Sequence, residues 1–296
     1  MIRSSIFRLH FIVFLWGFTA IIGKLISSDA YSLVFYRMFF ASIILFLFQF
    51  FFAGENLKIP KTLLFQLSGI GLIIAVHWCS FFYSIKTANV SIALSCLSLA
   101  TLFSAFLEPI IFRKRVDFTE VIIGVIVALC ISFIFGAEFQ YKKGIIAGII
   151  CAFLGSLFSV LNGKMFGKTS STNIIFYEML GGTIFLSLTL IITGKVSVLK
   201  EVKGTDFSLI ALLASLLTAY PMLESVRLMK YISPFTLTLT INLEPVYGII
   251  LAHFIFGASE HMTPVFYISS LVMVLSILTN TYIKTRKKSK KIIPKV

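Results

Sequence analysis

Polar residues recur along the apolar stretch 90–112 at spacings of three or four residues, which places them on one side of a helix. They are Ser91, Ser95, Ser98, Thr101, Ser104 and Glu108. Polar groups within a bilayer are costly unless they face protein or water, so this face indicates a surface that can bind a polar solute. The alternative is close helix packing, which small hydroxyl residues also allow.

The stretch 232–256 carries a second polar series, spaced by four, four and three residues: Thr236, Thr240, Glu244 and Tyr247. Pro245 removes a backbone hydrogen bond near the middle of this stretch and frees a carbonyl group. Transporters place substrate sites at such interrupted helices, so Asn242, Glu244 and the freed carbonyl are predicted to orient a solute. A kink that the membrane merely tolerates is the alternative.

Two more stretches, 63–85 and 207–228, add aromatic and ionisable candidates, and Trp16 adds one from the first stretch. A lone histidine in an apolar helix is more often a hydrogen-bonded structural group, and Glu224 and Arg227 stand three apart, where they can neutralise each other. Glu224 and Glu244 are candidates for proton exchange, which makes a proton or ion gradient a candidate energy source. The predicted substrate-binding residues are Trp16, His77, Trp78, Tyr83, Ser95, Ser98, Tyr220, Glu224, Asn242, Glu244 and Tyr247.

The sequence lacks patterns typical of catalysis or of metal binding. Its four cysteines lie singly in apolar stretches, and no histidine spacing suits zinc. The 12 acidic residues are scattered singly, without the clustered carboxylates of a membrane enzyme that acts on lipids. We therefore predict that the protein is not an enzyme and that it binds neither a cofactor nor a metal.

The elements that must position these residues are membrane helices. Hydrophobic residues make up 58% of the chain and charged residues 13%, against about 25% charged in an ordinary soluble domain. Apolar runs of about 20 residues suffice to cross a bilayer as helices. The sequence predicts an all-α integral membrane protein with ten such spans: 7–27, 32–52, 63–85, 90–112, 119–136, 144–164, 173–193, 207–228, 232–256 and 264–283.

The chain repeats itself weakly. Phe35-Tyr36-Arg37-Met38 returns as Phe176-Tyr177-Glu178-Met179, and other partial matches follow in the same order at offsets of 140 to 144 residues. This pattern predicts two five-helix repeats, residues 1–140 and 141–283. Because five is odd, the second repeat must enter the membrane upside down relative to the first.

The distribution of Lys and Arg predicts the orientation. With both termini in the cytoplasm, 18 of the 26 cations fall on the inner side and six on the outer side. Seven of them lie in the basic cytoplasmic tail, 284–296, which would attract anionic membrane lipids. The formal charge of +14 therefore does not indicate nucleic-acid binding, and we expect a bacterial inner membrane.

Three groups of residues resemble the EamA-like branch of the drug/metabolite transporter superfamily. They are Leu15-Trp16-Gly17, the run from Ala75 to Ser91, and the run from Lys230 to Tyr247. The resemblance implies an inverted-repeat bundle around a central cavity and small organic cargo, often amino acids or other metabolites moved outward. One departure is Ala100, where many relatives carry a proline equivalent to Pro245.

These observations predict a secondary transporter that exports a small organic metabolite by alternating access through a central cavity. The alternatives are a channel, a membrane scaffold that does not transport, and an integral-membrane enzyme that acts on lipids.

Overall fold

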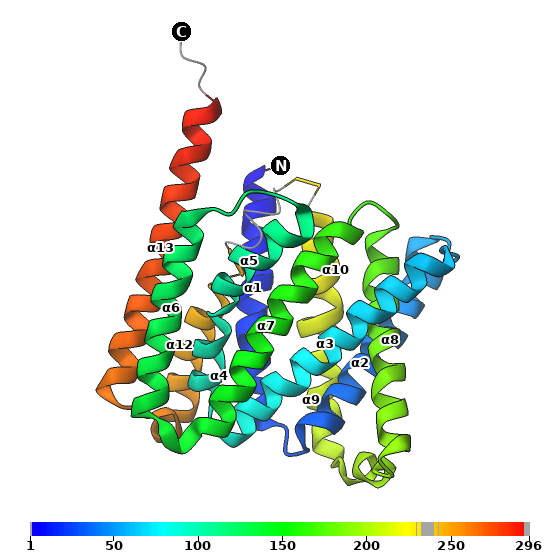
Figure 1. Ribbon diagram of the computed structural model, residues 1–296. Coiled ribbons are helices and arrows are strands. Elements are labelled where there is room, and N and C mark those ends of the chain that lie inside the picture. The colour runs from blue at the N-terminus through cyan, green and yellow to red at the C-terminus, as the bar shows by residue number, and fades with distance from the viewer. Residues whose placement is uncertain (1, 229, 232–239, 242, 293–296) are drawn as a thin grey trace.

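The computed structural model describes residues 2–228, 230–231, 240–241 and 243–292. Among these residues the chain folds into a bundle of helices (Figure 1). The α-helices are α1 (Ile2–Leu25), α2 (Ala30–Phe48), α3 (Lys61–Thr87), α4 (Val90–Leu97), α5 (Ala100–Phe112), α6 (Phe118–Ala137), α7 (Lys142–Met165), α8 (Ser171–Ile192), α9 (Gly204–Ala214), α10 (Tyr220–Leu228), α12 (Glu244–Phe256) and α13 (Pro264–Ile292). Shorter segments are the π-helices η1 (Gln49–Ala53) and η4 (Ser215–Ala219) and the 3₁₀-helices η2 (Phe139–Tyr141), η3 (Val196–Glu201) and η5 (Gly257–Glu260).

Short polar side chains cap the N-termini of four of the helices. Asp29 before α2, Asn89 before α4, Asp117 before α6 and Ser170 before α8 each accept a hydrogen bond from a backbone N–H of the first turn. These N–H groups have no partner within the helix, so each cap satisfies a donor that would otherwise be left unpaired. The caps therefore fix where these apolar stretches become helical.

In the described part of the chain, eight helical stretches are long and apolar enough to cross a membrane, and they coincide with the first eight predicted spans. They are Ser5–Leu25, Ala30–Ala53, Lys61–Thr87, Val90–Phe112, Phe118–Ala137, Phe139–Met165, Ser171–Ile192 and Gly204–Leu228. The ninth predicted span includes residues 232–239 and 242, which lie outside the described residues, and its remainder contains the 13-residue α12. The tenth coincides with a shorter apolar helix, Pro264–Asn280.

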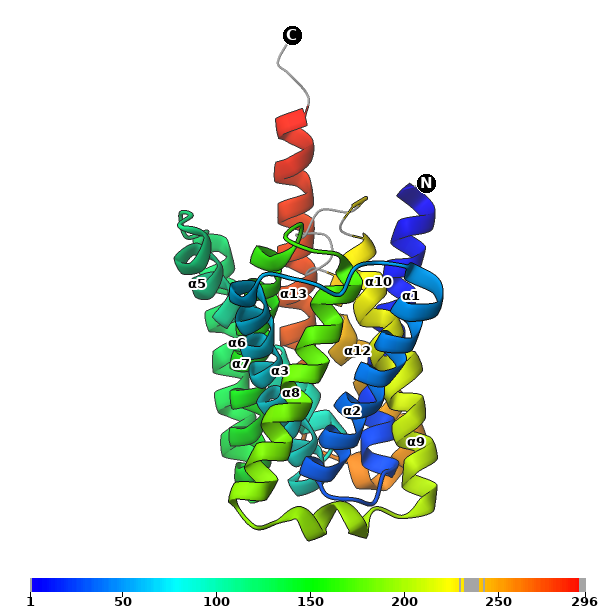
Figure 2. The same cartoon turned by 90° about the vertical axis from the view of Figure 1, so that its right-hand side faces the viewer.

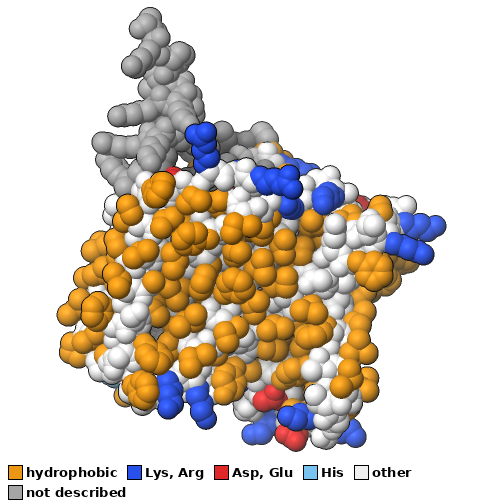
Figure 3. Space-filling view, viewed as in Figure 1, with side chains coloured by type: hydrophobic (Ala, Val, Ile, Leu, Met, Phe, Trp, Pro, Cys, Tyr) orange, Lys and Arg blue, Asp and Glu red, His pale blue; other side chains and the backbone are white. Residues whose placement is uncertain are grey.

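The outer surface of the bundle is suited to lipid. Hydrophobic side chains cover most of the face seen in Figure 3, and Lys and Arg gather toward its two ends. Phe65, Phe118, Phe133 and Phe254 are all largely exposed. Apolar surface of this extent would be unfavourable in water. The chain is therefore a multi-pass membrane protein.

The first eight spans run in alternating directions, and α1 and α7 run in opposite ones (Figure 1). The start of α1 and the end of α13 lie at the same end of the bundle, which we call the terminal end (Figures 1 and 2). From there α1 runs to the opposite end, whereas α7 runs toward the terminal end (Figure 1).

Glycines bring α3 and α8 into backbone contact. A Cβ atom on Gly71 would clash with the backbone carbonyl of Glu178 and lie 2.9 Å from the backbone nitrogen of Gly182. Small residues allow such close approach between membrane helices, where packing replaces the hydrophobic effect as the driving force. The crossing connects one helix of each predicted repeat.

Two tyrosines, one in each half of the chain, form a hydrogen bond with a loop of the other half. The Tyr36 hydroxyl donates a hydrogen bond to the Leu199 carbonyl over 3.1 Å, and the Tyr177 hydroxyl donates to the Leu57 carbonyl over 2.6 Å. The tyrosines stand 141 residues apart in the sequence and the two leucines 142. The same hydrogen bond is thus made twice, once from each half.

Candidate functional site

Arg37, on α2, lies deep in the bundle and exposes only 2% of its surface. Its Nε donates a hydrogen bond to Thr218 Oγ1 over 2.7 Å. The guanidinium carbon lies 3.7 Å from the centre of the Trp78 ring and 5.6 Å from that of Phe82, both on α3. Cations are attracted to aromatic faces at these distances. Three elements, α2, α3 and η4, therefore hold the guanidinium group in place.

Thr218 reaches Arg37 because the helix around it widens into η4. The Thr218 hydroxyl donates to the Leu213 carbonyl over 2.6 Å and accepts from Arg37, so both of its roles are used. Pro221 lies two residues after the end of η4, in the first turn of α10. Proline cannot donate to the carbonyl four residues earlier, that of Leu217. Single π turns within α-helices are frequent at functional sites.

His77 and Trp78 are neighbours on α3. His77 Nδ1 lies 2.8 Å from the Cys151 carbonyl oxygen of α7, and the ring packs against Phe158 with the ring centres 5.2 Å apart. This geometry agrees with the alternative of a hydrogen-bonded structural histidine. The contact also places His77 between the two halves of the chain, close enough to Arg37 for electrostatic interaction.

Glu244 brings a carboxyl group toward the same region. It is the first residue of α12, is partly buried, and lies close enough to Arg37 for electrostatic interaction. The backbone is interrupted just before it, where the Leu243 N–H donates to Thr240 three residues back rather than four. Pro245 follows, as the sequence predicted for an interrupted helix. We call Arg37, His77, Trp78, Thr218 and Glu244 the central cluster.

The predicted span 90–112 is also interrupted, between α4 and α5. The N–H groups of Ser98, Leu99 and Thr101 donate three residues back, so this turn is 3₁₀-like. The Ala100 carbonyl accepts a hydrogen bond from Ser156 Oγ of α7 over 2.8 Å. Although Ala100 stands where many relatives carry a proline, each half interrupts its fourth predicted span.

The predicted substrate-binding residues differ in burial. Buried or partly buried in the bundle are Trp16, His77, Trp78, Ser95, Ser98, Glu224, Glu244 and Tyr247. Tyr83 and Tyr220 are 45% and 42% exposed, so they lie outside the buried part of the site. Asn242 lies outside the described residues. Of the predicted set, the structure brings His77, Trp78 and Glu244 together around Arg37.

Two buried carboxylates, Glu224 and Glu178, have partners on neighbouring helices, and for Glu224 the partner differs from the Arg227 considered from the sequence. Glu224 is buried and forms an ion pair with Arg8 of α1, whereas Arg227 lies over the Phe48 ring. Glu178, which takes the place of Arg37 in the repeated tetrapeptide, accepts a hydrogen bond from Asn162 of α7 over 3.3 Å. Both partners face these carboxylates from a neighbouring helix, which spacing within one helix does not indicate.

Arg37 and Thr218 were missing from the predicted set. Thr218 gives no signal in the sequence, because only the π turn directs its hydroxyl at Arg37. Arg37 did give one: it is a cation inside an apolar stretch, within the repeated tetrapeptide. Ionisable residues at such positions are costly and usually functional.

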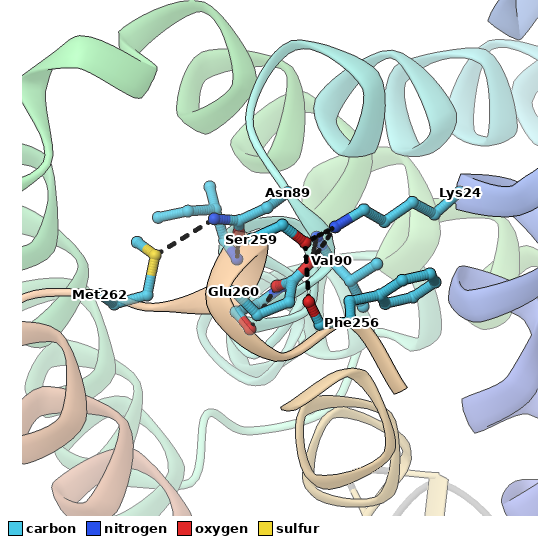
Figure 4. A network of polar contacts seen from close by, with 9 residues as sticks. Lys24, Asn89, Val90, Phe256, Ser259, Glu260 and Met262 are labelled. Carbon is cyan, nitrogen blue, oxygen red and sulfur yellow. Dashed lines mark hydrogen bonds and ion pairs between the residues drawn. The ribbon is translucent and has the colours of Figure 1, made fainter. Parts of the chain in front are cut away.

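A second polar cluster (Figure 4) lies at the end of the bundle opposite the termini, where α1 ends (Figure 1). Glu260, only 1% exposed, accepts hydrogen bonds from Lys24 Nζ at 2.7 Å, from the N–H groups of Val90 and Ser91 at 3.1 and 2.9 Å, and from Ser91 Oγ at 2.7 Å. We call these four residues the Glu260 cluster. It joins the end of α1, the start of α4 and the loop before α13. A carboxylate at a helix N-terminus is also favoured by the helix dipole.

Asp206 forms hydrogen bonds that stabilise the same end of the bundle. Its carboxylate, at the start of α9, accepts hydrogen bonds from the N–H groups of Ser27 and Ser28 at 2.9 and 2.8 Å. Lys86 Nζ donates to the Ile26 carbonyl of the same turn over 2.8 Å. The connection between α1 and α2 is therefore held by both α3 and α9.

Comparison with known proteins identifies the fold and the family. The profile of the EamA-like transporter family matches residues 4–136 and 142–282, one copy for each half. The chain belongs to the EamA-like transporter family. A solved crystal structure of 16% sequence identity matches with a TM-score of 0.68, over 96% of this chain and 99% of that chain. A search of curated proteins found no match.

Membership places this EamA-like chain within the drug/metabolite transporter superfamily, in agreement with the resemblance seen in the sequence. The two matched copies also explain the repeated tetrapeptide. Among the described residues, no group of three or more His, Cys, Asp or Glu side chains could hold a metal ion. The central cluster is therefore the candidate site of a membrane transporter.

Proposed function

We propose that this protein is a secondary transporter that exports a small organic metabolite by alternating access. The observation that carries the proposal is the central cluster: charged and aromatic side chains buried in a membrane bundle, contributed by helices of both family repeats. Such groups are expensive within a membrane and usually mark a substrate path. The cargo is proposed to contact the central cluster together with Trp16, Ser95, Ser98, Asn242 and Tyr247.

We further propose that the two repeats form an inverted ten-helix architecture. The opposite directions of α1 and α7 support it (Figure 1), as do the equivalent hydrogen bonds of Tyr36 and Tyr177. A second equivalent pair adds to this support, because Ser32 Oγ donates to the Val198 carbonyl and Asn173 Nδ2 donates to the Asn56 carbonyl. With both termini cytoplasmic, the Glu260 cluster lies on the outer side of a bacterial inner membrane.

Alternating access requires a closed end that can open. The Glu260 cluster and the contacts of Asp206 join α1, α3, α4, α9 and the loop before α13 at one end of the bundle. Rocking of one repeat against the other must break the contacts that cross between the repeats, those of Glu260 and Asp206, to admit cargo from that side. The proposed transport cycle therefore alternates between this closed outer end and an open one.

The proposal is tested with purified protein in proteoliposomes loaded with a defined metabolite mixture. Efflux of each solute is measured by mass spectrometry, with empty liposomes as control. A carrier gives saturable efflux that is accelerated by the same solute on the far side. Efflux that fails to saturate would indicate a channel instead, and absence of efflux for every solute would overturn the proposal. Repeating the assay with an imposed pH gradient tests coupling to protons.

A cross-link tests the closed end. Lys24→Cys combined with Glu260→Cys, joined by a short reducible linker, should stop transport, and reduction should restore it. Each single cysteine variant treated with the linker is the matched control, since it accounts for reaction with the four native cysteines. Full transport in the linked protein would show that this end need not open.

A further inference from the structure

The charge of Arg37 has no direct counter-ion among the described residues. The ion pairs there engage Arg8, Lys24 and Lys114, not Arg37. Glu244 interacts with Arg37 electrostatically but forms no such pair. A buried charge without a partner is strongly unfavourable, so a protein that keeps one gains something from it.

Arg37 also has an unused hydrogen-bond donor. Nε is occupied by Thr218, but Nη1 is buried and has no hydrogen-bond partner in the described part of the chain. Buried donors are nearly always paired in folded proteins, so each exception calls for an explanation. Because Trp78 and Phe82 lie against the guanidinium group and Thr218 binds Nε, the unpaired Nη1 keeps a defined direction.

We propose that Arg37 is the anion subsite of this transporter and that it binds a carboxylate of the cargo. This inference rests on the proposed function and adds the chemical class of the cargo. A carboxylate matches the planar donor edge of a guanidinium group and supplies the missing negative charge. Aromatic neighbours exclude water, which strengthens the ion pair.

A monoanion suits this site better than a phosphate does. Arg37 is the single cation of the central cluster among the described residues, and one positive charge balances one carboxylate. The inference therefore selects metabolites with one carboxylate at the bound end.

Thermal stabilisation of the detergent-purified protein tests the inference. The probes are phenylacetate, isovalerate and indole-3-acetate, each compared with its neutral amide and with phenethylamine and inorganic phosphate. At least one carboxylate should raise the apparent melting temperature, because a ligand that binds only the folded state stabilises it. Its amide should do so at concentrations about tenfold higher or not at all, since a hydrogen bond to a charged group is lost.

Variants separate recognition from structure. Arg37→Gln should lose the response to carboxylates while the unliganded protein melts at the same temperature or higher, because an uncompensated charge is gone. Arg37→Lys should keep part of the response. Arg227→Gln is the matched control, since it removes another cation near an aromatic ring, that of Phe48, outside the central cluster.

Two results would overturn the inference. One is equal stabilisation of wild type and Arg37→Gln by a carboxylate, and the other is no stabilisation of wild type by any of the three. Neither result bears on transport itself: if the liposome assay shows saturable export of a neutral or cationic solute that Arg37→Gln preserves, the transporter stands and only the anion subsite fails.

Discussion

Arg37 and Glu178 occupy equivalent places in the repeated tetrapeptide, and both are fully buried, at 2% and 0% exposure. One carries a potential positive charge and the other a potential negative charge, on helices α2 and α8. Their partners are neutral, since Thr218 binds Arg37 and Asn162 binds Glu178. The two halves of the bundle thus place opposite ionisable groups at corresponding positions, which makes the protein electrically asymmetric although its helices repeat.

Glu178→Gln should leave the stability nearly unchanged. No ion pair engages Glu178 among the described residues, and Gln keeps its shape and a carbonyl acceptor for Asn162. Glu178→Ala should cost about 2–4 kcal/mol, because it leaves a cavity and an unpaired donor. Thermal unfolding in detergent measures both. A large loss in the Gln variant would mean that the negative charge itself is needed.

Gly71→Ala should destabilise the crossing of α3 and α8 by about 2 kcal/mol or more, because the new methyl group would overlap the Glu178 carbonyl. Gly69→Ala, on the same helix with nothing within 4 Å, is the control and should stabilise by about 0.5–1 kcal/mol. The two melting temperatures should therefore move in opposite directions. Equal shifts would contradict the close backbone contact.

Tyr36→Phe and Tyr177→Phe should have similar effects, each about 0.5–1.5 kcal/mol destabilising. Each variant removes one hydroxyl that donates to a loop carbonyl and leaves the ring in place. Denaturation of the two variants side by side provides the comparison. If one were neutral and the other severe, the two hydrogen bonds would not be equivalent.

Glu260→Ala should cost about 2–4 kcal/mol, since it leaves Lys24 without its carboxylate and the first N–H groups of α4 without an acceptor. It should also increase the labelling, by a water-soluble thiol reagent, of a cysteine introduced by Val90→Cys at the buried start of α4. Glu108→Gln is the control, because its ion pair with Lys114 is exposed and should contribute almost nothing. Unchanged labelling would argue against opening at this end.

Thr218→Val should weaken carboxylate binding about tenfold, because Arg37 Nε loses its acceptor and the guanidinium group is free to turn. Thr218→Ser restores the hydroxyl and should restore the affinity. The response of the melting temperature to phenylacetate distinguishes the two. Thr218 is a positioning residue in this view, so rescue by Ser is the decisive observation.

Much of the fold follows from hydropathy, because a continuous apolar run has few alternatives to a membrane helix. Eight predicted spans coincide with helices for that reason. The side-chain ion pairs were harder to predict from the sequence. Lys24 pairs with Glu260, which is 236 residues away, and Glu224 pairs with Arg8 on another helix. Spacing within one helix cannot indicate such partners. The proline at position 245 correctly predicted an interruption of its helix. The interruption near Ala100 was not predicted, because no proline is present there.

The π turn of η4 also bears on how the two halves diverged. A π turn accommodates one residue more than an α turn, and α3, the corresponding helix of the first half, runs without one from Lys61 to Thr87. The offset between the halves grows across this helix, from 142 at Leu57 and Leu199 to 144 at Lys86 and Lys230. One residue inserted in an ancestral copy would produce the π turn and one of the two positions by which the offset grows. The π turn that places the Thr218 hydroxyl against Arg37 would then have originated as a change in length after duplication, not as a substitution.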